Sequence, residues 1–405
     1  MKVLISGASI AGPVLAYWLN RRGFDVTVVE RAPALRKTGG HAIDLIGPAM
    51  GITHQMGLTD RVLERATGTE RLVMYRAGAA RPAHIDYHKV TAALSRQHVE
   101  IMRDDLSEIF YAAGREDVEY LFGDHITGID DDGQVRFAHG ATRQFDMVVG
   151  ADGLHSGVRR VVFGEDAGHT EFLGAYLSVV SVPKALARDG EMTGWVDVDR
   201  TAMIYTADHL DDARAVFIFR PSTTYEYDHR DTASHQRLLQ ERFAGMAEPV
   251  DRWLAEVDRT QAFYFDAITQ LQLTSWSRGR VTLVGDAGYC PGPAVGGSTS
   301  LAVIGAYVLA GELERAGGDH TAAFRAYEDV MRQPVAGARA LAKGMAKGIL
   351  PSSQLGVRAL IAAGQLISLL PTPITSAIAG LNDKGIRLYD SIGVPDYPVS
   401  VGPRG

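Results

Sequence analysis

The sequence has a single cysteine, Cys290, among its 405 residues. One cysteine cannot form an internal disulfide bond, and it excludes a metal site built on several cysteines. The motif Gly-x-Ser-x-Gly is also missing, which removes the usual signal of an α/β-hydrolase nucleophile. We therefore expect no bound metal, and we expect Cys290 to be a small buried hydrophobic residue.

The chain has neither an excess of positive charge nor a long hydrophobic run. Its 41 basic residues against 48 acidic ones give a net charge of −7, which gives no reason to expect a nucleic-acid partner. Gly7, Gly12 and Pro13 interrupt the apolar start, which argues against a signal peptide. The apolar stretch 355–370 contains Arg358 and is shorter than the roughly 20 residues that span a membrane. We expect a cytoplasmic protein without an integral membrane segment, and its oligomeric state is not indicated.

Hydrophobic patterning predicts a β-α-β unit at the start of the chain. Residues 2–5 form a short apolar strand, a glycine turn follows, and a helix begins near Pro13, where a missing N–H costs nothing. Residues 25–30 are typical of a strand in a buried parallel sheet. Further along we expect a solvated turn at 208–214, helices over about 90–113, 232–257 and 297–345, and strands at 145–149, 176–182, 194–198, 202–206, 215–219 and 281–284.

The segment Gly7-x-Ser9-x-x-Gly12 lies between the first strand and the first helix, where a dinucleotide fingerprint belongs. Its glycines allow a tight turn and close helix packing, and the helix N-terminus supplies N–H groups for a pyrophosphate. Ser9 replaces the usual middle glycine, but serine is small and its hydroxyl can donate a hydrogen bond. Glu30 ends the second strand, where a carboxylate is expected to hold the hydroxyls of a bare ribose, as in FAD or NAD.

Three further segments complete the pattern. They are Arg103-Asp104-Asp105-Leu106, Gly150-Ala151-Asp152-Gly153, and Gly285-Asp286 after a buried strand. In this order, the motifs make the chain resemble the class A flavoprotein aromatic hydroxylases, which include para-hydroxybenzoate hydroxylase and the tetracycline-inactivating monooxygenases. The resemblance extends over nearly the whole chain and is nearest to the tetracycline-inactivating branch.

The resemblance implies FAD as the cofactor and identifies residues that hold it. Asp44 would contact FAD, Arg31 the adenosine end and Arg36 the nicotinamide nucleotide, although a solvated surface position for Arg36 stays open. The implied cofactor-binding residues are Gly7, Ser9, Ile10, Ala11, Gly12, Glu30, Arg31, Arg36, Gly40, Asp44, Arg103, Asp152, Gly153, Gly285, Asp286, Pro293, Gly296, Gly297, Ser298 and Thr299.

The third motif departs from the pattern of that group. Gly288-Tyr289 replaces Ala-His, and residues 296–300 replace Gly-Gln-Gly-x-Asn. Small residues at 296–298 still allow backbone N–H groups to reach the flavin pyrimidine edge, where reduced flavin is negatively charged. We therefore expect flavin binding with altered contacts.

A chain of 405 residues suits two domains that share a cofactor. The predicted fold is α/β: a Rossmann-type FAD-binding domain of the GR2 type, an inserted, mostly β substrate domain, and C-terminal helices. We expect the FAD-binding domain to comprise residues 1–72, 98–168 and 275–350, the substrate domain residues 73–97 and 169–274, and the helical C-terminal segment residues 351–405.

The resemblance implies an FAD-dependent monooxygenase that consumes O2 and NADPH (or NADH). Only one nucleotide fingerprint is present, as in the class A hydroxylases, which bind the nicotinamide nucleotide transiently. The implied reaction is hydroxylation of an aromatic, polyketide or other specialised metabolite through a C4a-hydroperoxyflavin, in antibiotic modification or biosynthesis. Two alternatives stay open: a flavin-dependent dehydrogenase or reductase, and a non-catalytic flavoprotein that binds a pathway intermediate.

The inserted sheet is expected to supply the substrate contacts. Strand alternation directs about half of its aromatic residues to one side, which would cover the substrate above the flavin. We expect Tyr176, Tyr205 and Phe219 in this role. Arg220 either orients a polar substrate or caps the sheet, and the sequence identifies no catalytic base.

Overall fold

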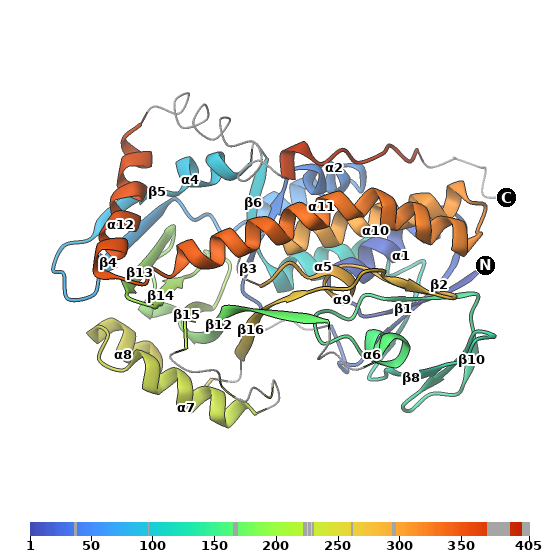
Figure 1. Cartoon of the computed structure of the whole chain (residues 1–405), viewed down its shortest axis with the longest axis horizontal. Coiled ribbons are helices and arrows are strands. Elements are labelled where there is room, and N and C mark those ends of the chain that lie inside the picture. The colour runs from blue at the N-terminus through green and yellow to red at the C-terminus, as the bar shows by residue number, and fades with distance from the viewer. Residues whose placement is uncertain are drawn as a thin grey trace.

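Two β-sheets lie side by side in this computed structural model and are crossed by one long helix (Figure 1). The described residues are 1–35, 39–95, 97–164, 169–221, 225, 228, 231–260, 262–293, 297–370 and 389–398. Helices and strands alternate through the first sheet, so the predicted α/β fold class is confirmed.

The first sheet carries the N-terminal β-α-β unit. All neighbouring strands run parallel except the edge strand β17. Residues 3–5 and 26–29 are buried, as expected for parallel strands covered on both faces. α1 (Ala11–Arg21) follows the first strand, as predicted. In the described part of the chain the strand order is β17 (Ser277–Arg278), β18 (Val281–Leu283), β11 (Met147–Gly150), β1 (Lys2–Ser6), β2 (Asp25–Glu30) and β7 (Glu119–Phe122).

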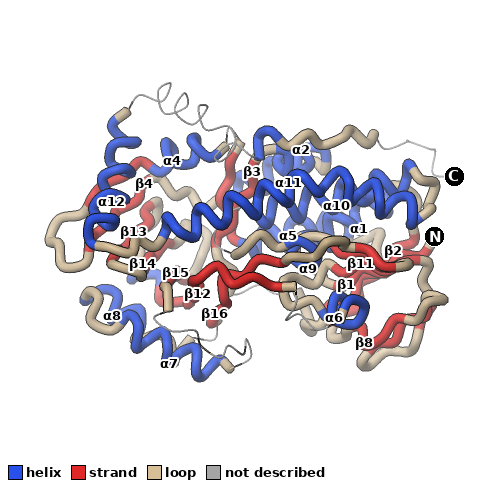
Figure 2. The backbone as a smooth tube through the Cα atoms, in the orientation of Figure 1, coloured by secondary structure: helices blue, strands red, loops and turns tan. Residues whose placement is uncertain are grey.

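A small antiparallel sheet extends this half of the molecule at the lower right of Figure 2. The turn between its first two strands contains Gly133, whose φ of +95° favours glycine. α6 (Gly157–Phe163) packs against it. Its strands are β8 (Ile126–Ile129), β9 (Gln134–Phe137) and β10 (Arg143–Gln144).

The second sheet is antiparallel except between β13 and β4, which are parallel. Two helices, α7 (Thr232–Phe243) and α8 (Glu248–Leu254), lie below it in Figure 1. Across the described residues the strand order is β16 (Phe263–Leu271), β12 (Thr170–Pro183), β15 (Asp212–Phe219), β14 (Arg200–Tyr205), β13 (Glu191–Asp197), β4 (Arg71–Arg76) and β5 (Ala83–Asp86).

The two faces of this second sheet contact different parts of the chain. Tyr176 and Phe219 are cross-strand neighbours, and both lie in a buried cluster with Phe243 of α7. Tyr205 lies in a separate cluster with Met102 and Leu350. The aromatic residues of the sheet are therefore divided between its faces.

A two-stranded antiparallel ladder of β3 (Ala42–Ile46) and β6 (His98–Met102) lies between the sheets, near the centre of Figure 1. The predicted continuous helix over 90–113 is wrong, because the chain forms α4 (Tyr87–Leu94), then β6, and then α5 (Arg103–Gly114). Pairing with β3 buries Val99 and Ile101 on one side of β6, and this tertiary contact outweighs helical propensity.

Helices dominate the remaining described residues. α11 runs across both sheets in Figure 1, and with α10 it forms the helices predicted over about 297–345. The expected helical C-terminal segment is only partly helical, because residues 392–398, which contain Pro395 and Pro398, form no helix. The elements are α2 (Pro48–Gln55), α3 (Thr59–Glu64), η2 (Lys184–Leu186), α9 (Asp286–Tyr289), α10 (Ser298–Arg315), α11 (His320–Ile349), α12 (Gln354–Leu369) and η3 (Tyr389–Ser391).

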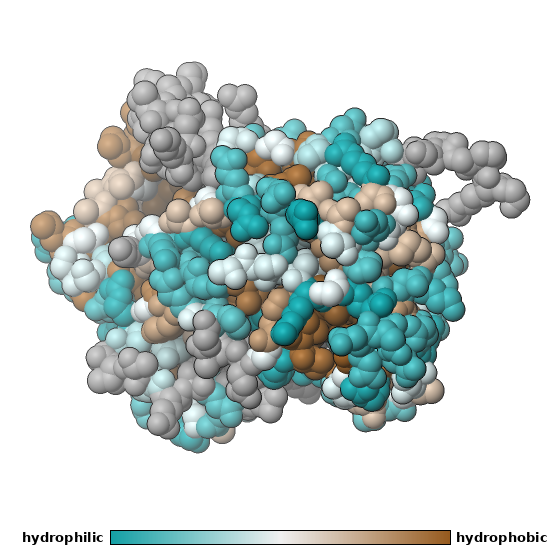
Figure 3. Space-filling model, turned by 45° about the vertical axis from the view of Figure 1, so that its right-hand side comes forward, coloured by the Kyte–Doolittle hydropathy of each residue, from teal (hydrophilic) through white to brown (hydrophobic). Residues whose placement is uncertain are grey.

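The surface is mixed in polarity. In Figure 3, hydrophilic residues cover much of the visible face and hydrophobic ones gather toward its left side. α12 exposes Leu355, Leu366 and Leu369 to solvent. No helix within the described ranges is both long and apolar enough to cross a membrane.

We expect Arg159 of α6 to be important for stability. It is fully buried, and its guanidinium donates to the carbonyl oxygens of Leu154 (2.5 Å) and Ala287 (2.8 Å). Arg159→Met leaves both buried carbonyls without these donors, so the free energy of unfolding in urea should fall by about 3 kcal/mol. The matched control is Arg160→Met on the exposed side of α6, expected to change it by less than about 0.5 kcal/mol. Equal stability of the two variants would contradict this expectation.

Candidate functional site

The first two glycine motifs meet where β1 and β11 end. The backbone N–H of Gly7 donates to Val29 (2.8 Å), and that of Ala151 donates to Ser6 (2.8 Å). Gly7 has a φ of +106°, and a Cβ on it would lie 2.5 Å from the carbonyl oxygen of Ala151. Only glycine permits this approach, so the fingerprint turn lies directly against the second motif.

The third motif packs onto the same edge of the sheet. The N–H of Val284 donates to the carbonyl of Gly150 (2.9 Å). Gly285 has a φ of +65°, and a Cβ built on it would lie 3.2 Å from the Cβ of Ala302 and 3.4 Å from the Cβ of Ala11. Ala11 lies in the first turn of α1 and Ala302 in α10. The structure thus brings together three motifs that are more than a hundred residues apart.

Glu30 lies at the carboxyl end of β2 beside the glycine turn. Its two carboxylate oxygens accept hydrogen bonds from the backbone N–H groups of Ala8 (3.0 Å) and Ala32 (2.8 Å). Each oxygen keeps a further lone pair, so the carboxylate suits a ribose with two free hydroxyls. The neighbouring Arg31 is exposed at the same edge.

Positive charge and free backbone donors gather at the N-terminus of α1. Ile10, the first residue of the turn into α1, makes no side-chain cap, which leaves the first N–H groups of the helix without a capping acceptor. Arg103 donates to the Ser9 hydroxyl (3.3 Å), and Ser107 donates to the Ser9 carbonyl (3.1 Å). Helix donors and a guanidinium at one point are what a pyrophosphate requires, so these residues fit FAD.

The peptide of Gly40 is held from both sides. Its N–H donates to the Asp104 carboxylate (2.7 Å), and its carbonyl accepts from Nε of Arg214 (2.8 Å). Burial raises the pKa of Asp104, although the Gly40 N–H and the charges of Arg103 and Arg214 oppose that effect. The predicted solvated turn over 208–214 is wrong at its end, because Arg214 is buried in β15.

His41 follows this peptide and is kept neutral. Burial, with the positive charges of Arg103 and Arg214, lowers its pKa from 6.5 to about 4, while Asp44 acts in the opposite direction. Its ring lies against that of Tyr264, with centroids 5.6 Å apart. A neutral imidazole beside two guanidinium groups adds no further positive charge at the site.

Asp44 and the second motif have contacts that the sequence did not predict. The carboxylate of Asp44 is hydrogen-bonded to Nε2 of His98 (2.7 Å), and its expected contact with FAD stays a prediction. Asp152 accepts hydrogen bonds from Ser156 (2.5 Å) and from the N–H groups of Gly157 (2.9 Å) and Val158 (3.1 Å). These contacts of Asp152 fix the start of α6, so its direct contact with FAD stays a prediction, as does that of Gly153.

The loop before α10 supplies the remaining predicted residues. Ser298 donates to the Asp286 carboxylate, and Gly297, with a φ of +84°, ends the turn into α10. Pro293 and Thr299 are both half-buried beside them. Gly296 and Arg36 lie outside the described residues.

The proposed substrate residues do not come together. Tyr176 and Phe219 are in the core under α7, whereas the Tyr205 hydroxyl accepts a hydrogen bond from the Ala42 N–H (2.6 Å) beside Gly40. Arg220 donates to Asp199 and to the carbonyl of Leu350 (3.2 Å), which is the arrangement of a residue that closes the sheet end. It borders a cavity of about 260 Å³ on that side.

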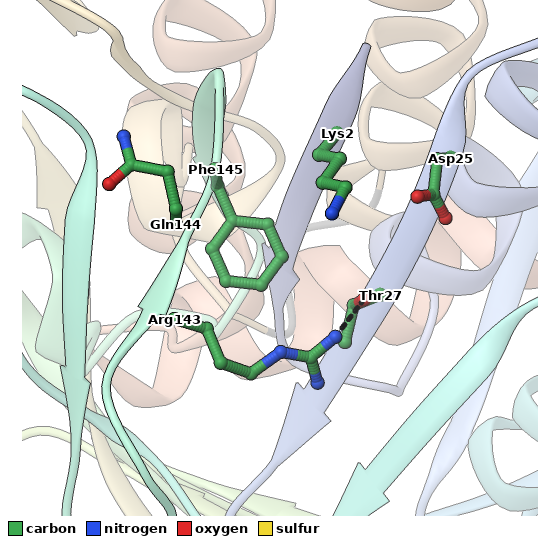
Figure 4. A pocket seen from close by; sticks show the side chains of 6 residues that line it. All are labelled: Lys2, Asp25, Thr27, Arg143, Gln144 and Phe145. Atoms are coloured by element: carbon green, nitrogen blue, oxygen red, sulfur yellow. Dashed lines mark hydrogen bonds between the residues drawn. The ribbon is translucent and has the colours of Figure 1, made fainter.

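A cavity of about 210 Å³ is shown in Figure 4, at the amino ends of the parallel strands. It is lined by Lys2, Asp25, Thr27, Arg143, Gln144 and Phe145. Ligands of open α/β sheets bind at the carboxyl ends of the strands, so this cavity is not the cofactor site.

Metal ligands do not cluster in the part of the chain that the structure describes. No group of three or more His, Cys, Asp or Glu side chains there could hold a metal ion. His84 and His88 have the spacing of a helical ligand pair, but His84 is on β5 and His88 on α4. Cys290 is buried, as predicted.

Sequence patterns did not identify Arg214 and His98, and they included Asp104 in a motif without a role of its own, because each becomes part of the site through a partner far away in the chain. The Arg214 guanidinium reaches Gly40 across 174 residues, and Nε2 of His98 reaches Asp44 across 54. A charged residue inside the apolar β15 sequence was the one available signal for Arg214.

We expect His41 to make the fold sensitive to acid. Between pH 6.5 and about 4 the unfolded chain takes up a proton at His41 but the folded protein does not, so stability falls as the pH falls through this window. His41→Gln removes this proton uptake. From pH 7 to pH 4.5, the free energy of unfolding should therefore fall by about 2 kcal/mol less in His41→Gln than in the wild type. Urea unfolding at both pH values measures the difference. Parallel losses in the two proteins would show that His41 titrates normally.

Comparison with known proteins agrees with this geometry. A family described as an FAD binding domain matches residues 1–328. A flavin-dependent monooxygenase of an unknown prokaryotic organism is 39% identical over 358 residues, which cover 87% of this chain and 91% of that protein. A flavin-dependent monooxygenase of Legionella longbeachae is 36% identical over 335 residues, covering 82% and 85% of the two chains.

Solved structures extend the comparison to the fold. The crystal structure of tetracycline destructase Tet(55) is 34% identical, with a TM-score of 0.81 and 98% of each chain covered. The structure of Klebsiella pneumoniae HpxO complexed with FAD and uric acid is 22% identical, has a TM-score of 0.73, covers 95% of this chain and 97% of that one, and shows a shared fold. Since the family match spans most of the sequence, the chain belongs to the FAD-binding-domain family and is an FAD-dependent monooxygenase of the class A type.

Proposed function

We propose that this monooxygenase oxygenates a polycyclic, hydroxylated aromatic molecule of the tetracycline type, with O2 and NADPH as co-substrates. The likeness to tetracycline destructase Tet(55) over 98% of both chains is the observation that carries the proposal. The name of that protein refers to tetracycline, and we extend the substrate class, not the individual compound, to this chain.

The residues at the junction between the ladder and the second sheet support a large, mostly apolar substrate. The face that carries Tyr205 has Met192, Met203, Tyr264 and Ile349 packed at its border, each only partly buried. Methionine side chains adapt to irregular ring systems. The polar side chains of Asp44 on β3 and Glu100 on β6 lie near Tyr205 at the same junction. A ring system with hydroxyl groups on one edge would suit this combination of apolar and polar residues.

The side chains of the chain would bind and orient the cofactor. FAD, when bound, supplies the transfer of electrons from the nicotinamide nucleotide to O2 and the reactive oxygen. The N–H groups at the start of α1 and the Arg103 guanidinium would neutralise the pyrophosphate, and Glu30 would hold the ribose. Asp286 and Ser298 would position the flavin end at the start of α10.

The remaining expectations form part of the same proposal. The strands of the second sheet, β4 and β5 among them, support a substrate domain built from residues 73–97 and 169–274 and inserted into an FAD-binding domain. The boundaries at 1–72, 98–168, 275–350 and 351–405 are proposed with it. We place the enzyme in the cytoplasm, where NADPH is available as transient reductant.

The test is turnover of tetracycline by the purified, FAD-loaded protein. We expect tetracycline to stimulate NADPH oxidation and O2 uptake in equal amounts and to yield a product heavier by one oxygen atom, detected by mass spectrometry. NADH in place of NADPH shows which nucleotide is used. Anaerobic turnover at the same rate would indicate a dehydrogenase, and no response to tetracycline or to other hydroxylated polycyclic aromatic compounds would remove the proposed substrate class.

Arg103→Gln tests the proposed cofactor residues. Loss of a charge-assisted hydrogen bond to a phosphate costs about 1.5–3 kcal/mol, so the Kd for FAD should rise roughly 10- to 100-fold. Quenching of FAD fluorescence on titration with apoprotein measures Kd. The control is Arg65→Gln, at the end of α3, which removes a guanidinium paired with Asp105 (2.7 Å). A similar Kd for both variants would exclude Arg103 from the pyrophosphate site.

A further inference from the structure

The ladder of β3 and β6 has one apolar and one polar face. Ile43, Leu45 and Ile101 pack into the core of the FAD-binding half. Asp44 and Glu100 are directly opposite each other in the antiparallel register and therefore share the other face. The hydrogen bond from the Ala42 N–H to the Tyr205 hydroxyl (2.6 Å) brings the start of β3 to the second sheet. Burial raises the pKa of Tyr205, and the charges of Glu100 and Asp44 add to this effect, so the middle of this face lies at the junction where the substrate is proposed to bind. His98 pairs with Ile46 at the end of the ladder away from Ala42 and reaches the middle through Asp44.

His98 lies on this polar face with one ring nitrogen engaged. Its Nε2 is 2.7 Å from the Asp44 carboxylate, which is acceptor-only when ionised, so Nε2 carries the hydrogen. In the neutral ring, Nδ1 is then the nitrogen with a free lone pair. No described residue is hydrogen-bonded to Nδ1. The side chains of His98 and Asp44 are 12% and 35% exposed, so the pair is not sealed in the core.

A second layer of hydrogen bonds holds the pair. The Glu100 carboxylate accepts from the hydroxyls of Tyr87 (2.7 Å), Thr69 (2.9 Å) and Thr67. The ring of Tyr87 meets that of His98 edge to face, with centroids 6.3 Å apart. Burial raises the pKa of Glu100 and the charge of Asp44 adds to this effect, while the hydrogen bonds from Thr67, Tyr87 and Thr69 oppose it. The titratable and charged groups around the pair are His41 before β3, Tyr87 of α4, Glu100 of β6, Arg103 of α5, Tyr205 of β14 and Arg214 of β15.

We propose that His98 is the general base that removes the proton from a ring hydroxyl of the substrate, and that Asp44 is its positioning residue. This inference rests on the proposed function, since it requires a hydroxylated ring. In the step, the substrate O–H bond breaks and an N–H bond forms at Nδ1. The substrate becomes an anion, and the imidazolium is stabilised by the Asp44 carboxylate. The negative charge makes the ring more electron-rich and so more reactive toward an electrophilic oxygen.

The first experiment tests whether His98 is accessible. The FAD-loaded protein is treated with diethyl pyrocarbonate, and modified histidines are identified by peptide mass spectrometry. We expect modification of His98 and protection by bound tetracycline. His235, which is buried and stacked on Phe265 with ring centroids 4.3 Å apart, is the unreactive control. An unmodified His98 in the folded protein would overturn the proposal without any assay of turnover.

The second experiment compares the pH dependence of kcat/KM for tetracycline. In the wild type, kcat/KM should fall tenfold per pH unit below the pKa of the base, which gives the pH profile an acid limb. His98→Gln should lack this acid limb, and its kcat/KM should be about 100-fold lower near neutral pH. Asp44→Asn should shift the limb, because the amide cannot stabilise the imidazolium, and Asp44→Glu should partly restore it. His139→Gln, after β9, is the matched control with an unchanged profile.

The outcomes separate this inference from the proposed function. Normal wild-type turnover with the same pH limb in His98→Gln removes His98 as the base and leaves the proposed function intact. No turnover of tetracycline or of other hydroxylated polycyclic aromatic compounds by the wild type removes the proposed substrate class, and the base falls with it. Bound FAD, followed by its visible spectrum in every variant, shows that a loss of activity does not come from cofactor loss.

Discussion

The close contact of backbone against backbone at Gly7 is the constraint on which the rest of the site depends. A side chain at this position would collide with the carbonyl of Ala151, and one at Gly285 would press on Ala11 and Ala302. Because these turns contain glycine, the ends of β1, β11 and β18 close on one point. The N–H groups of the α1 turn then face outward from the sheet edge, where a phosphate can reach them.

A second constraint joins the two halves of the molecule through charge. Asp104 and Arg214 hold opposite sides of the Gly40 peptide, the first from the FAD-binding half and the second from the second sheet. Arg214 is buried and Asp104 is half-buried, so their charges are screened less than charges on the surface. The second sheet is therefore fixed against the segment around Gly40, which is predicted to contact the cofactor.

The sequence predicted what local backbone geometry determines and missed what distant pairing determines. The glycine turns, the β-α-β unit and the carboxylate at Glu30 were predicted, because each depends on residues that are close together in the chain. The strand at His98–Met102 was predicted as helix, since its strand state depends on β3, more than fifty residues earlier. Arg214 was placed in a solvated turn for the same reason: its carbonyl partner at Gly40 is invisible to any local pattern.

The register of the ladder of β3 and β6 also depends on contacts with residues far away in the chain. A strand pair with one buried face is sensitive to register, because a slip by one residue would turn Asp44 into the core and Ile43 toward the substrate side. Ser300 accepts from the Ile46 N–H (3.0 Å) and contacts the Asp44 carbonyl (3.4 Å), which fixes one end of β3 on α10. Tyr205 fixes the other end through the Ala42 N–H. α10 follows the loop that is proposed to hold the flavin, and Tyr205 belongs to the second sheet, so β3 is anchored to both. Strand alternation then directs Ile43 and Leu45 into the core and Asp44 to the other face, where the proposed proton acceptor His98 is bonded to it.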